Sequence, residues 1–137
     1  MDFELTDEQK DIQRAAREFA EKMFPEVAEE CDLNETFPME LWKKACELGF
    51  VGVFIDEAYG GAGLGFLEHA LITEEFSRVD AGCGSILTTT LGSEFILFSG
   101  REEQKKKYLP LLPKGKAIMG MAITEPDAGS DVASVST

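Results

Sequence analysis

Near the end of the 137-residue chain the sequence reads Ala122-Ile123-Thr124-Glu125-Pro126-Asp127-Ala128-Gly129-Ser130-Asp131-Val132-Ala133-Ser134. The apolar run over residues 118–123 predicts a strand that exits into a turn. Pro126 fixes its own φ and keeps the residue before it extended, so the strand end is stiff. Gly129 lets the backbone approach a ligand closely, and the Thr124 and Ser130 hydroxyls can donate hydrogen bonds. The stretch suits a phosphate or the edge of a heteroaromatic ring, and an ordinary strand-to-loop junction has the same pattern.

The length and composition indicate one ordinary globular domain. The chain is 44% hydrophobic and 28% charged, and its net charge is −13. So acidic a chain is not expected to bind nucleic acid or an anionic membrane. It has no run of 18 apolar residues and no basic, apolar leader, so neither a transmembrane helix nor a signal peptide is expected.

The cysteines and the single histidine predict no metal site. Cys31, Cys46 and Cys83 are odd in number and widely spaced, without a ligand pattern. Reduced thiols in a cytoplasmic protein are the natural interpretation. His69 is expected to be a structural histidine.

The stretches before residue 118 predict a mainly α fold: a bundle of about five helices, a short extended segment, and one or two β-strands at the C-terminal edge. Thr6 and Gln9 form a predicted capping box for the first helix, which Pro25 bends or interrupts. Residues 31–36 read as a loop and residues 50–55 as a buried extended segment. Further helices are predicted from Pro38 to Gly49, over residues 67–76, over residues 85–99, and from a cap formed by Ser99 and Glu102.

Two segments allow more than one interpretation. Residues 60–65 are rich in glycine, but the G-x-G-x-x-G spacing fails because Phe66 stands at the third glycine position, so a loop is predicted rather than a dinucleotide site. The triplet of threonines at residues 88–90 is unusual in an apolar helix. Its hydroxyls either bond back to the preceding turn or form a wall that faces a ligand.

Five stretches together resemble the acyl-CoA dehydrogenase family of flavoproteins. They are residues 5–9 (Leu-Thr-Asp-Glu-Gln), 60–65 (Gly-Gly-Ala-Gly-Leu-Gly), 74–80 (Glu-Glu-Phe-Ser-Arg-Val-Asp), 103–110 (Glu-Gln-Lys-Lys-Lys-Tyr-Leu-Pro) and 124–131 (Thr-Glu-Pro-Asp-Ala-Gly-Ser-Asp). Each is short, but their order and spacing are specific, and they extend over residues 3–137. One departure is Asp127, where the family most often carries glycine.

The resemblance implies a helical N-terminal domain over residues 1–115 and the beginning of a middle β-domain over residues 116–137. The implied reaction is α,β-dehydrogenation of an acyl-CoA thioester in fatty acid metabolism. A glutamate removes the α-proton, FAD accepts the hydride, and an electron-transfer flavoprotein accepts the electrons. The family's base lies in a later bundle, so no catalytic residue is assigned here and this part is expected to be inactive alone. Glu125 is implied to be structural. A homo-oligomer is also expected.

The resemblance also implies particular binding residues. Met121, Ile123, Thr124 and Ser130 match positions that contact FAD, and Ser130 also matches a contact to the CoA portion of the substrate. Leu87, Thr88 and Leu91 match the helix that lines the acyl pocket. Two alternatives are open: a non-catalytic helical module that self-associates through residues 118–123, and a parent protein that is an acyl-CoA oxidase or a related flavoprotein oxidase.

Overall fold

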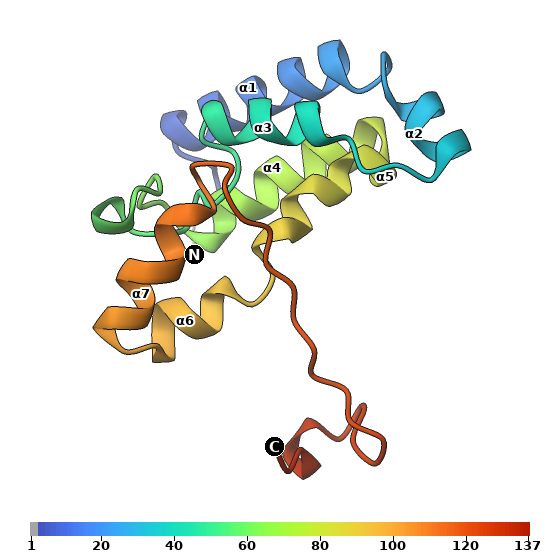
Figure 1. Ribbon diagram of the computed structural model, residues 1–137. Coiled ribbons are helices and arrows are strands. Elements are labelled where there is room, and N and C mark those ends of the chain that lie inside the picture. The colour runs from blue at the N-terminus through green and yellow to red at the C-terminus, as the bar shows by residue number, and fades with distance from the viewer. Residues whose placement is uncertain (1–2) are drawn as a thin grey trace.

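The computed structural model describes residues 3–137 and is mostly helical (Figure 1), which confirms the predicted fold class. The elements are α1 (Asp7–Met23), α2 (Ala28–Asn34), α3 (Met39–Glu47), η1 (Glu57–Tyr59), α4 (Phe66–Val79), α5 (Ala81–Gly84), η2 (Ser85–Thr90), α6 (Ser93–Ser99), α7 (Glu102–Tyr108), η3 (Leu109–Leu111) and η4 (Val132–Ser134). Here η denotes a 3-10 helix.

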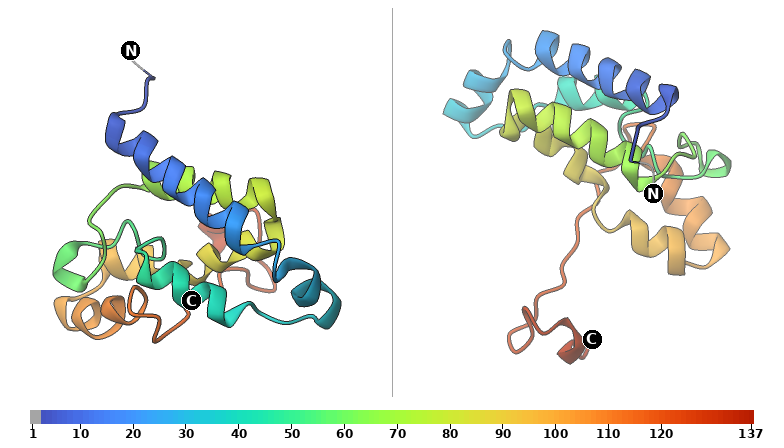
Figure 2. Two further views of the ribbon diagram at one scale, coloured as in Figure 1. Left: turned by 90° about the horizontal axis from the view of Figure 1, so that it is seen from above. Right: turned by 180° about the vertical axis from the view of Figure 1, so that it is seen from behind.

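The long helices α1 and α4 pack side by side and carry the core (Figure 2). The predicted capping box begins α1: Gln9 N–H donates to Thr6 Oγ1 at 3.2 Å, and Thr6 N–H donates to Gln9 Oε1 at 3.0 Å. Phe76 of α4 is fully buried, with the Phe24 and Phe50 rings 5.1 and 5.4 Å from its own between centroids. This aromatic cluster fixes α1 and α4 against the chain that follows α3.

Two predictions of non-helical structure are wrong. Residues 31–36 include most of α2, a polar helix without buried residues, whose Asn34 amide donates to the Glu30 carbonyl at 2.9 Å. Residues 50–55 are buried but turn instead of extending, because Gly49 and Gly52 have φ of +79° and +75°. A β-branched, apolar segment favours a strand only where its neighbours allow an extended backbone.

Two helix boundaries also differ from the predictions. The segment 85–99 is not one helix: η2 ends at Thr90, and Gly92, with φ of +94°, separates it from α6. The cap of α7 is Arg101, whose backbone N–H donates to Gln104 Oε1 at 2.9 Å, whereas Ser99 is still part of α6. Both Ser99–Glu102 and Arg101–Gln104 have the three-residue spacing of a capping box. The backbone conformation, which the spacing alone does not report, decides which pair begins the helix.

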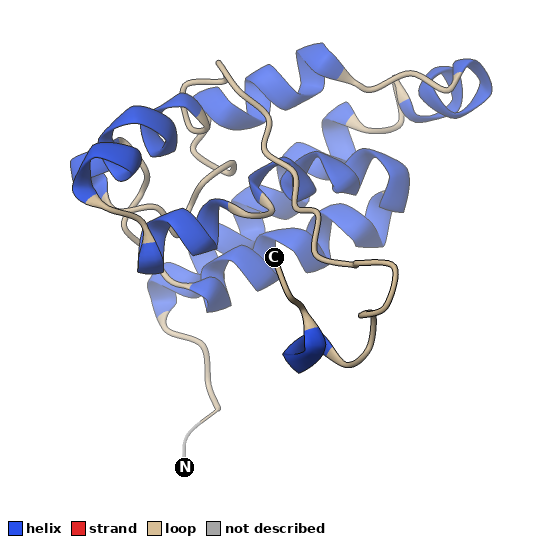
Figure 3. Ribbon diagram, turned by 60° about the horizontal axis from the view of Figure 1, so that its bottom comes forward, coloured by secondary structure: helices blue, strands red, loops and turns tan. Residues whose placement is uncertain are grey.

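After residue 117 the chain continues as an extended tail, which first contacts the helical body at Thr89 and Gly92 and then projects away from it (Figure 1). No strand occurs in residues 3–137, and the only bridge pairs Glu125 with Ala128 (Figure 3). The predicted strand over residues 118–123 is therefore extended but has no neighbouring strand. A strand needs a partner to accept its hydrogen bonds, and no other part of the described chain supplies one.

Residues 81–99 have the length and mean hydropathy, 1.2, of a membrane-spanning helix, although no such helix is predicted from the sequence. Within this segment 44% of the residues are buried inside the fold, and the chain breaks at Gly92. A core segment of a globular domain has the same composition.

Candidate functional site

A hollow of about 210 Å³ lies between α4 and the segment that follows it. Its α4 wall consists of His69, Thr73 and Ser77, and its other wall includes Leu87, Thr88, Leu91 and Glu94. The structure thus brings the three predicted acyl-pocket residues to one cavity. Leu87 is buried at its floor, while Thr88 and Leu91 are exposed at its edge.

The threonine triplet fits both interpretations of the sequence. Each hydroxyl donates to a carbonyl three residues earlier, at 2.6 Å for Thr88, 2.7 Å for Thr89 and 2.9 Å for Thr90. Thr89 is buried and also accepts a hydrogen bond from Trp42 Nε1 at 3.0 Å. Back-bonding therefore occurs at all three positions, while Thr88 also faces the hollow.

The tail begins beside the same wall. Met119 N–H donates to the Thr89 carbonyl at 2.8 Å. Gly92 lets the tail pass closely, since a Cβ at Gly92 would lie 3.1 Å from the Gly120 carbonyl oxygen and 3.7 Å from Met121 Cβ. Met121, a predicted cofactor contact, is thus held next to the wall that carries the predicted substrate contacts.

The remaining predicted cofactor residues lie farther along the tail. Ile123 is half-buried, and the Thr124 and Ser130 side chains are exposed and hydrogen-bonded to no other residue of the described chain. Ser130 is not among the residues that line the hollow. The hydroxyls of both residues are free to donate to a ligand.

The Glu125 side chain is hydrogen-bonded to the last two residues of the tail. Its carboxylate accepts hydrogen bonds from Ser136 N–H, Ser136 Oγ and Thr137 N–H, at 3.0 to 3.1 Å. Hydrogen bonds from Thr137 and Ser136 lower the pKa of Glu125 to about 2. A carboxylate with so low a pKa is a poor proton acceptor, which is compatible with the structural role that the family resemblance implies for Glu125.

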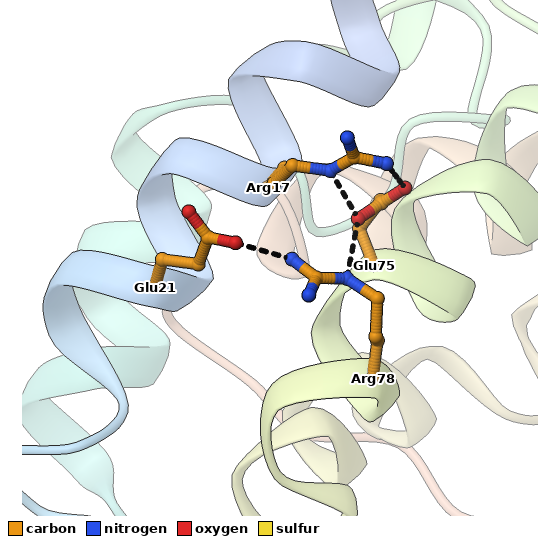
Figure 4. A network of polar contacts seen from close by, with 4 residues as sticks. All are labelled: Arg17, Glu21, Glu75 and Arg78. Carbon is orange, nitrogen blue, oxygen red and sulfur yellow. Dashed lines mark hydrogen bonds and ion pairs between the residues drawn. The ribbon is translucent and has the colours of Figure 1, made fainter.

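Sequence reasoning missed an ionic network between α1 and α4 (Figure 4). Glu75 is 2% exposed and accepts hydrogen bonds from Arg17 at 2.7 and 2.9 Å and from Arg78 Nε at 3.1 Å. Arg78 also pairs with Glu21 at 2.6 Å. The hydrogen bond from Arg17 is the main cause that lowers the pKa of Glu75. Arg17 lies 58 positions before Glu75 in the sequence, so only the position of α1 reveals this partner.

His69 is half-buried in the α4 wall. Burial lowers its pKa, although the nearby Glu94 carboxylate opposes the shift, so the imidazole is neutral near pH 7. Its Nδ1 atom is buried without a hydrogen-bond partner in the described chain. The prediction of a structural histidine is compatible with its edge-to-face contact with the Phe54 ring, at 5.3 Å between centroids.

A second, larger groove of about 580 Å³ runs along α1. We call it the α1 groove; its apolar lining includes Ile12, Phe19, Met23, Leu48, Phe50, Val53, Leu64 and Ile72. Lys22 and Lys44 stand at its rim together with Glu18, and neither lysine forms an ion pair with another residue of the described chain. An apolar floor with two available cations suits a protein partner rather than the solvent.

The three cysteines are free thiols. Burial raises the pKa of Cys46 to about 11 and that of Cys83 to about 12. No group of three or more potential metal ligands occurs within residues 3–137.

Known proteins are similar to this chain both over its helical body and over its whole length. Residues 6–116 match the family model of the acyl-CoA dehydrogenase N-terminal domain. An acryloyl-CoA reductase (NADH) of Anaerotignum propionicum is 42% identical over all of this chain. A short-chain-specific acyl-CoA dehydrogenase of Clostridium acetobutylicum is 44% identical over 96% of it. This chain spans 35% of the length of each of these relatives.

Solved structures have the same fold. One, on the electron-transferring flavoprotein of Acidaminococcus fermentans and flavin-based electron bifurcation, contains a chain that matches 98% of this one with a TM-score of 0.86 and 40% identity. The acyl-CoA dehydrogenase of Bacillus anthracis in complex with FAD matches 96% with a TM-score of 0.84 and 37% identity. The matches cover 36% and 23% of those chains.

Proposed function

This chain belongs to the acyl-CoA dehydrogenase family, and on that premise we propose that it supplies one wall of the acyl-CoA and flavin site of an enzyme that transfers hydrogen at the α,β bond of an acyl thioester. Leu87, Thr88 and Leu91 would contact the acyl chain. Met121, Ile123, Thr124 and Ser130 would contact FAD, with Ser130 also touching the CoA portion.

The observation that carries the proposal is the hydrogen bond from Met119 N–H to the Thr89 carbonyl, 2.8 Å long. This bond holds the chain just before Met121, the first proposed FAD contact, against Thr89, the middle residue of the threonine triplet. Gly92 removes the side chain that would keep the two segments apart. A substrate in the hollow and a ring lying on residues 121–124 would therefore be neighbours, which hydride transfer requires.

The residues of this chain fit one part of FAD better than another. The backbone N–H groups of residues 121–124 and the Thr124 hydroxyl are available donors, which suit the heteroatom edge of the flavin ring. When bound, the flavin supplies the hydride acceptor. No lysine or arginine follows Lys116, so the cations that a pyrophosphate needs are not offered by the tail, and Asp127 adds a negative charge there. Tight FAD binding is expected to need residues outside this chain.

No acid of this chain is assigned as the base that removes the α-proton. Glu125 is occupied by the end of the tail, and Glu75 is enclosed by Arg17 and Arg78. The role of this chain is therefore to shape and exclude water from one side of the site, rather than to move the proton.

The same site could support either dehydrogenation of an acyl thioester or reduction of an enoyl thioester. The relatives include an acyl-CoA dehydrogenase and an acryloyl-CoA reductase, and the geometry of a wall for the acyl chain serves oxidation and reduction equally. We propose dehydrogenation as the activity of the whole protein, with reduction of the corresponding enoyl thioester as the second candidate.

An electron-transfer flavoprotein is the proposed electron partner. The α1 groove supports an interaction of this kind, because it is open, apolar and bordered by the available cations Lys22 and Lys44. Leu48, 57% exposed at this groove, offers a direct test. Leu48→Asp is expected to weaken association with an electron-transfer flavoprotein, and Leu33→Asp on the far helix α2 is not.

The acyl-wall assignment is tested by calorimetric titration of the 137-residue chain with butyryl-CoA and with CoA alone. Butyryl-CoA is expected to bind weakly but more tightly than CoA, and Leu91→Trp is expected to weaken its binding by about tenfold, since a lost contact of about 1.4 kcal/mol has that effect. Leu33→Trp is the control, as Leu33 is 74% exposed on α2. Equal affinities for the wild type and Leu91→Trp would contradict the proposal.

A further inference from the structure

The hollow between α4 and the following segment has a polar lining, although an ordinary fatty acyl chain is apolar. Its lining includes the His69 imidazole, the Glu94 carboxylate and the hydroxyls of Ser77 and Ser85. The side chains of His69, Ser77 and Ser85 form no hydrogen bond with another residue of the described chain. A polar group that is covered by an apolar ligand loses its water without gaining a partner, which weakens binding. The lining therefore favours a ligand that carries a hydrogen-bonding group.

The two nitrogens of the His69 ring differ in their surroundings. Nδ1 is buried without a hydrogen-bond partner in residues 3–137, and the ring packs edge-to-face on Phe54. Nε2 is not buried in this way and also has no partner, so it is the ring nitrogen that a ligand can reach. A buried N–H without an acceptor is rarer in proteins than a buried acceptor without a donor. The proton of the neutral ring is therefore expected on Nε2, where it offers a donor to a ligand.

Glu94 supplies an acceptor and a negative charge near this donor. Its charge acts on the imidazole, since it opposes the lowering of the His69 pKa by burial. The carboxylate accepts one hydrogen bond from Gly92 N–H at 2.8 Å and has further lone pairs to offer. No lysine or arginine of the described chain lines the hollow. A hydroxyl can accept from an N–H and donate to a carboxylate at the same time, whereas a second carboxylate can only accept and is repelled by Glu94.

We propose that His69 is a specificity-determining residue that selects acyl thioesters with a hydroxyl group on the acyl chain. The His69 N–H donates to the hydroxyl oxygen, and the hydroxyl donates to the Glu94 carboxylate. An acyl chain with a methyl group in place of the hydroxyl leaves the N–H without an acceptor, and a chain that ends in a carboxylate faces the charge of Glu94. This inference rests on the proposed acyl site and goes beyond it by naming the class of acyl group.

Calorimetric titration of the 137-residue chain with matched ligands tests the preference. Thioesters of CoA with ω-hydroxyacyl chains of four to six carbons are each compared with the alkanoyl-CoA that carries a methyl group in place of the hydroxyl. At least one pair is expected to differ by about tenfold in favour of the hydroxyl, which corresponds to about 1.4 kcal/mol. Glutaryl-CoA, which ends in a carboxylate, is expected to bind more weakly than 5-hydroxypentanoyl-CoA. Equal affinities within every pair would overturn the proposal.

Variants of the α4 wall assign the preference to His69. His69→Phe keeps a ring but removes the N–H, and it is expected to abolish the preference while alkanoyl-CoA thioesters still bind. His69→Gln, whose amide can donate a hydrogen bond, is expected to keep part of the preference. Thr73→Val, one turn farther along α4, is the matched control, because the Thr73 hydroxyl already donates to the His69 carbonyl at 2.8 Å. It should keep the full preference, and a preference that persists in His69→Phe would contradict the assignment.

Nitrogen-15 NMR observes this side chain directly, because His69 is the single histidine of the chain. At pH 7 the proton is expected on Nε2, and a hydroxyacyl-CoA is expected to shift the Nε2 signal more than its alkanoyl partner does. A proton on Nδ1, or equal shifts with both ligands, would overturn the proposal. If alkanoyl-CoA binds and Leu91→Trp weakens it, but no hydroxyl is preferred, the acyl site stands and only the role of His69 fails. If no acyl-CoA binds more tightly than CoA, both fail.

Discussion

Replacing the buried carboxylate of Glu75 is expected to loosen the packing of α1 on α4. The side chain is 3% exposed and accepts hydrogen bonds from Arg17 and Arg78 (Figure 4). Glu75→Gln keeps the shape but removes the charge and one acceptor oxygen. It also turns an amide donor toward a guanidinium donor.

The magnitude follows from the exposure of the partners. Removing one member of a fully buried ion pair costs about 3–5 kcal/mol. The side chains of Arg17 and Arg78 are 49% and 46% exposed, so water can solvate them after the change. A hydrogen bond to a charged group contributes about 1.5–3 kcal/mol, and we expect Glu75→Gln to lower the free energy of unfolding by about 2 kcal/mol.

This loss depends on pH in a defined direction. The pKa of Glu75 is lowered in the folded state, mainly by the hydrogen bond from Arg17. The stabilisation by the carboxylate is therefore fully present above its unfolded pKa of about 4.3 and is lost as the pH falls through the folded pKa. The difference between the wild type and Glu75→Gln should be constant near neutral pH and should shrink in acid.

Urea unfolding followed by circular dichroism measures the effect. With an m-value of about 2 kcal/mol/M, a loss of 2 kcal/mol shifts the midpoint by about 1 M. Glu74→Gln is the matched control, because Glu74 is the exposed neighbour on the same helix and should change the stability by less than about 0.5 kcal/mol. Equal midpoints for the two variants would refute the reasoning.

Three further predictions concern the threonine wall, the tail and a thiol. Thr89→Val leaves the buried Trp42 indole N–H without its acceptor and should cost about 1–3 kcal/mol in urea unfolding, more than Thr90→Val, which loses only a back-bond. Gly92→Ala puts a Cβ on a residue with φ of +94° and 3.1 Å from a tail carbonyl, so it should cost about 1–3 kcal/mol and shift the tail's amide NMR signals; unchanged signals would contradict the contact. Cys83, whose pKa is raised to about 12 by burial, should react with a thiol reagent at neutral pH only after unfolding.

The helices were predictable where local signals agree with packing. The Thr6–Gln9 box and the apolar spacing behind it fix α1, and Pro25 follows its end at Met23. The polar helix α2 was missed because it has no apolar face to reveal it. The sequence did not predict that the helix over residues 85–99 is interrupted, because Gly92 looks like any small residue in an apolar run. In the structure Gly92 has a positive φ and separates η2 from α6.

The site was predictable in part for a similar reason. Leu87, Thr88 and Leu91, which the family resemblance implies to be acyl-pocket residues, line one hollow because they lie within five positions of one another. Their contact with an acyl chain stays a prediction. The α1 groove and the Glu75 network join residues more than 50 positions apart, including Arg17 and Glu75. No local pattern reports such contacts, because they depend on how α1 crosses α4.

The most direct test of the central claim is a methyl NMR titration of the 137-residue chain with butyryl-CoA and FAD. We expect butyryl-CoA to shift the methyl signals of Leu87, Thr88 and Leu91, and FAD to shift those of Met121 and Thr124. Both sets should respond when the two ligands are added together. Shifts confined to the α1 groove, or no shift at Leu87 and Leu91 with saturating butyryl-CoA, would contradict it.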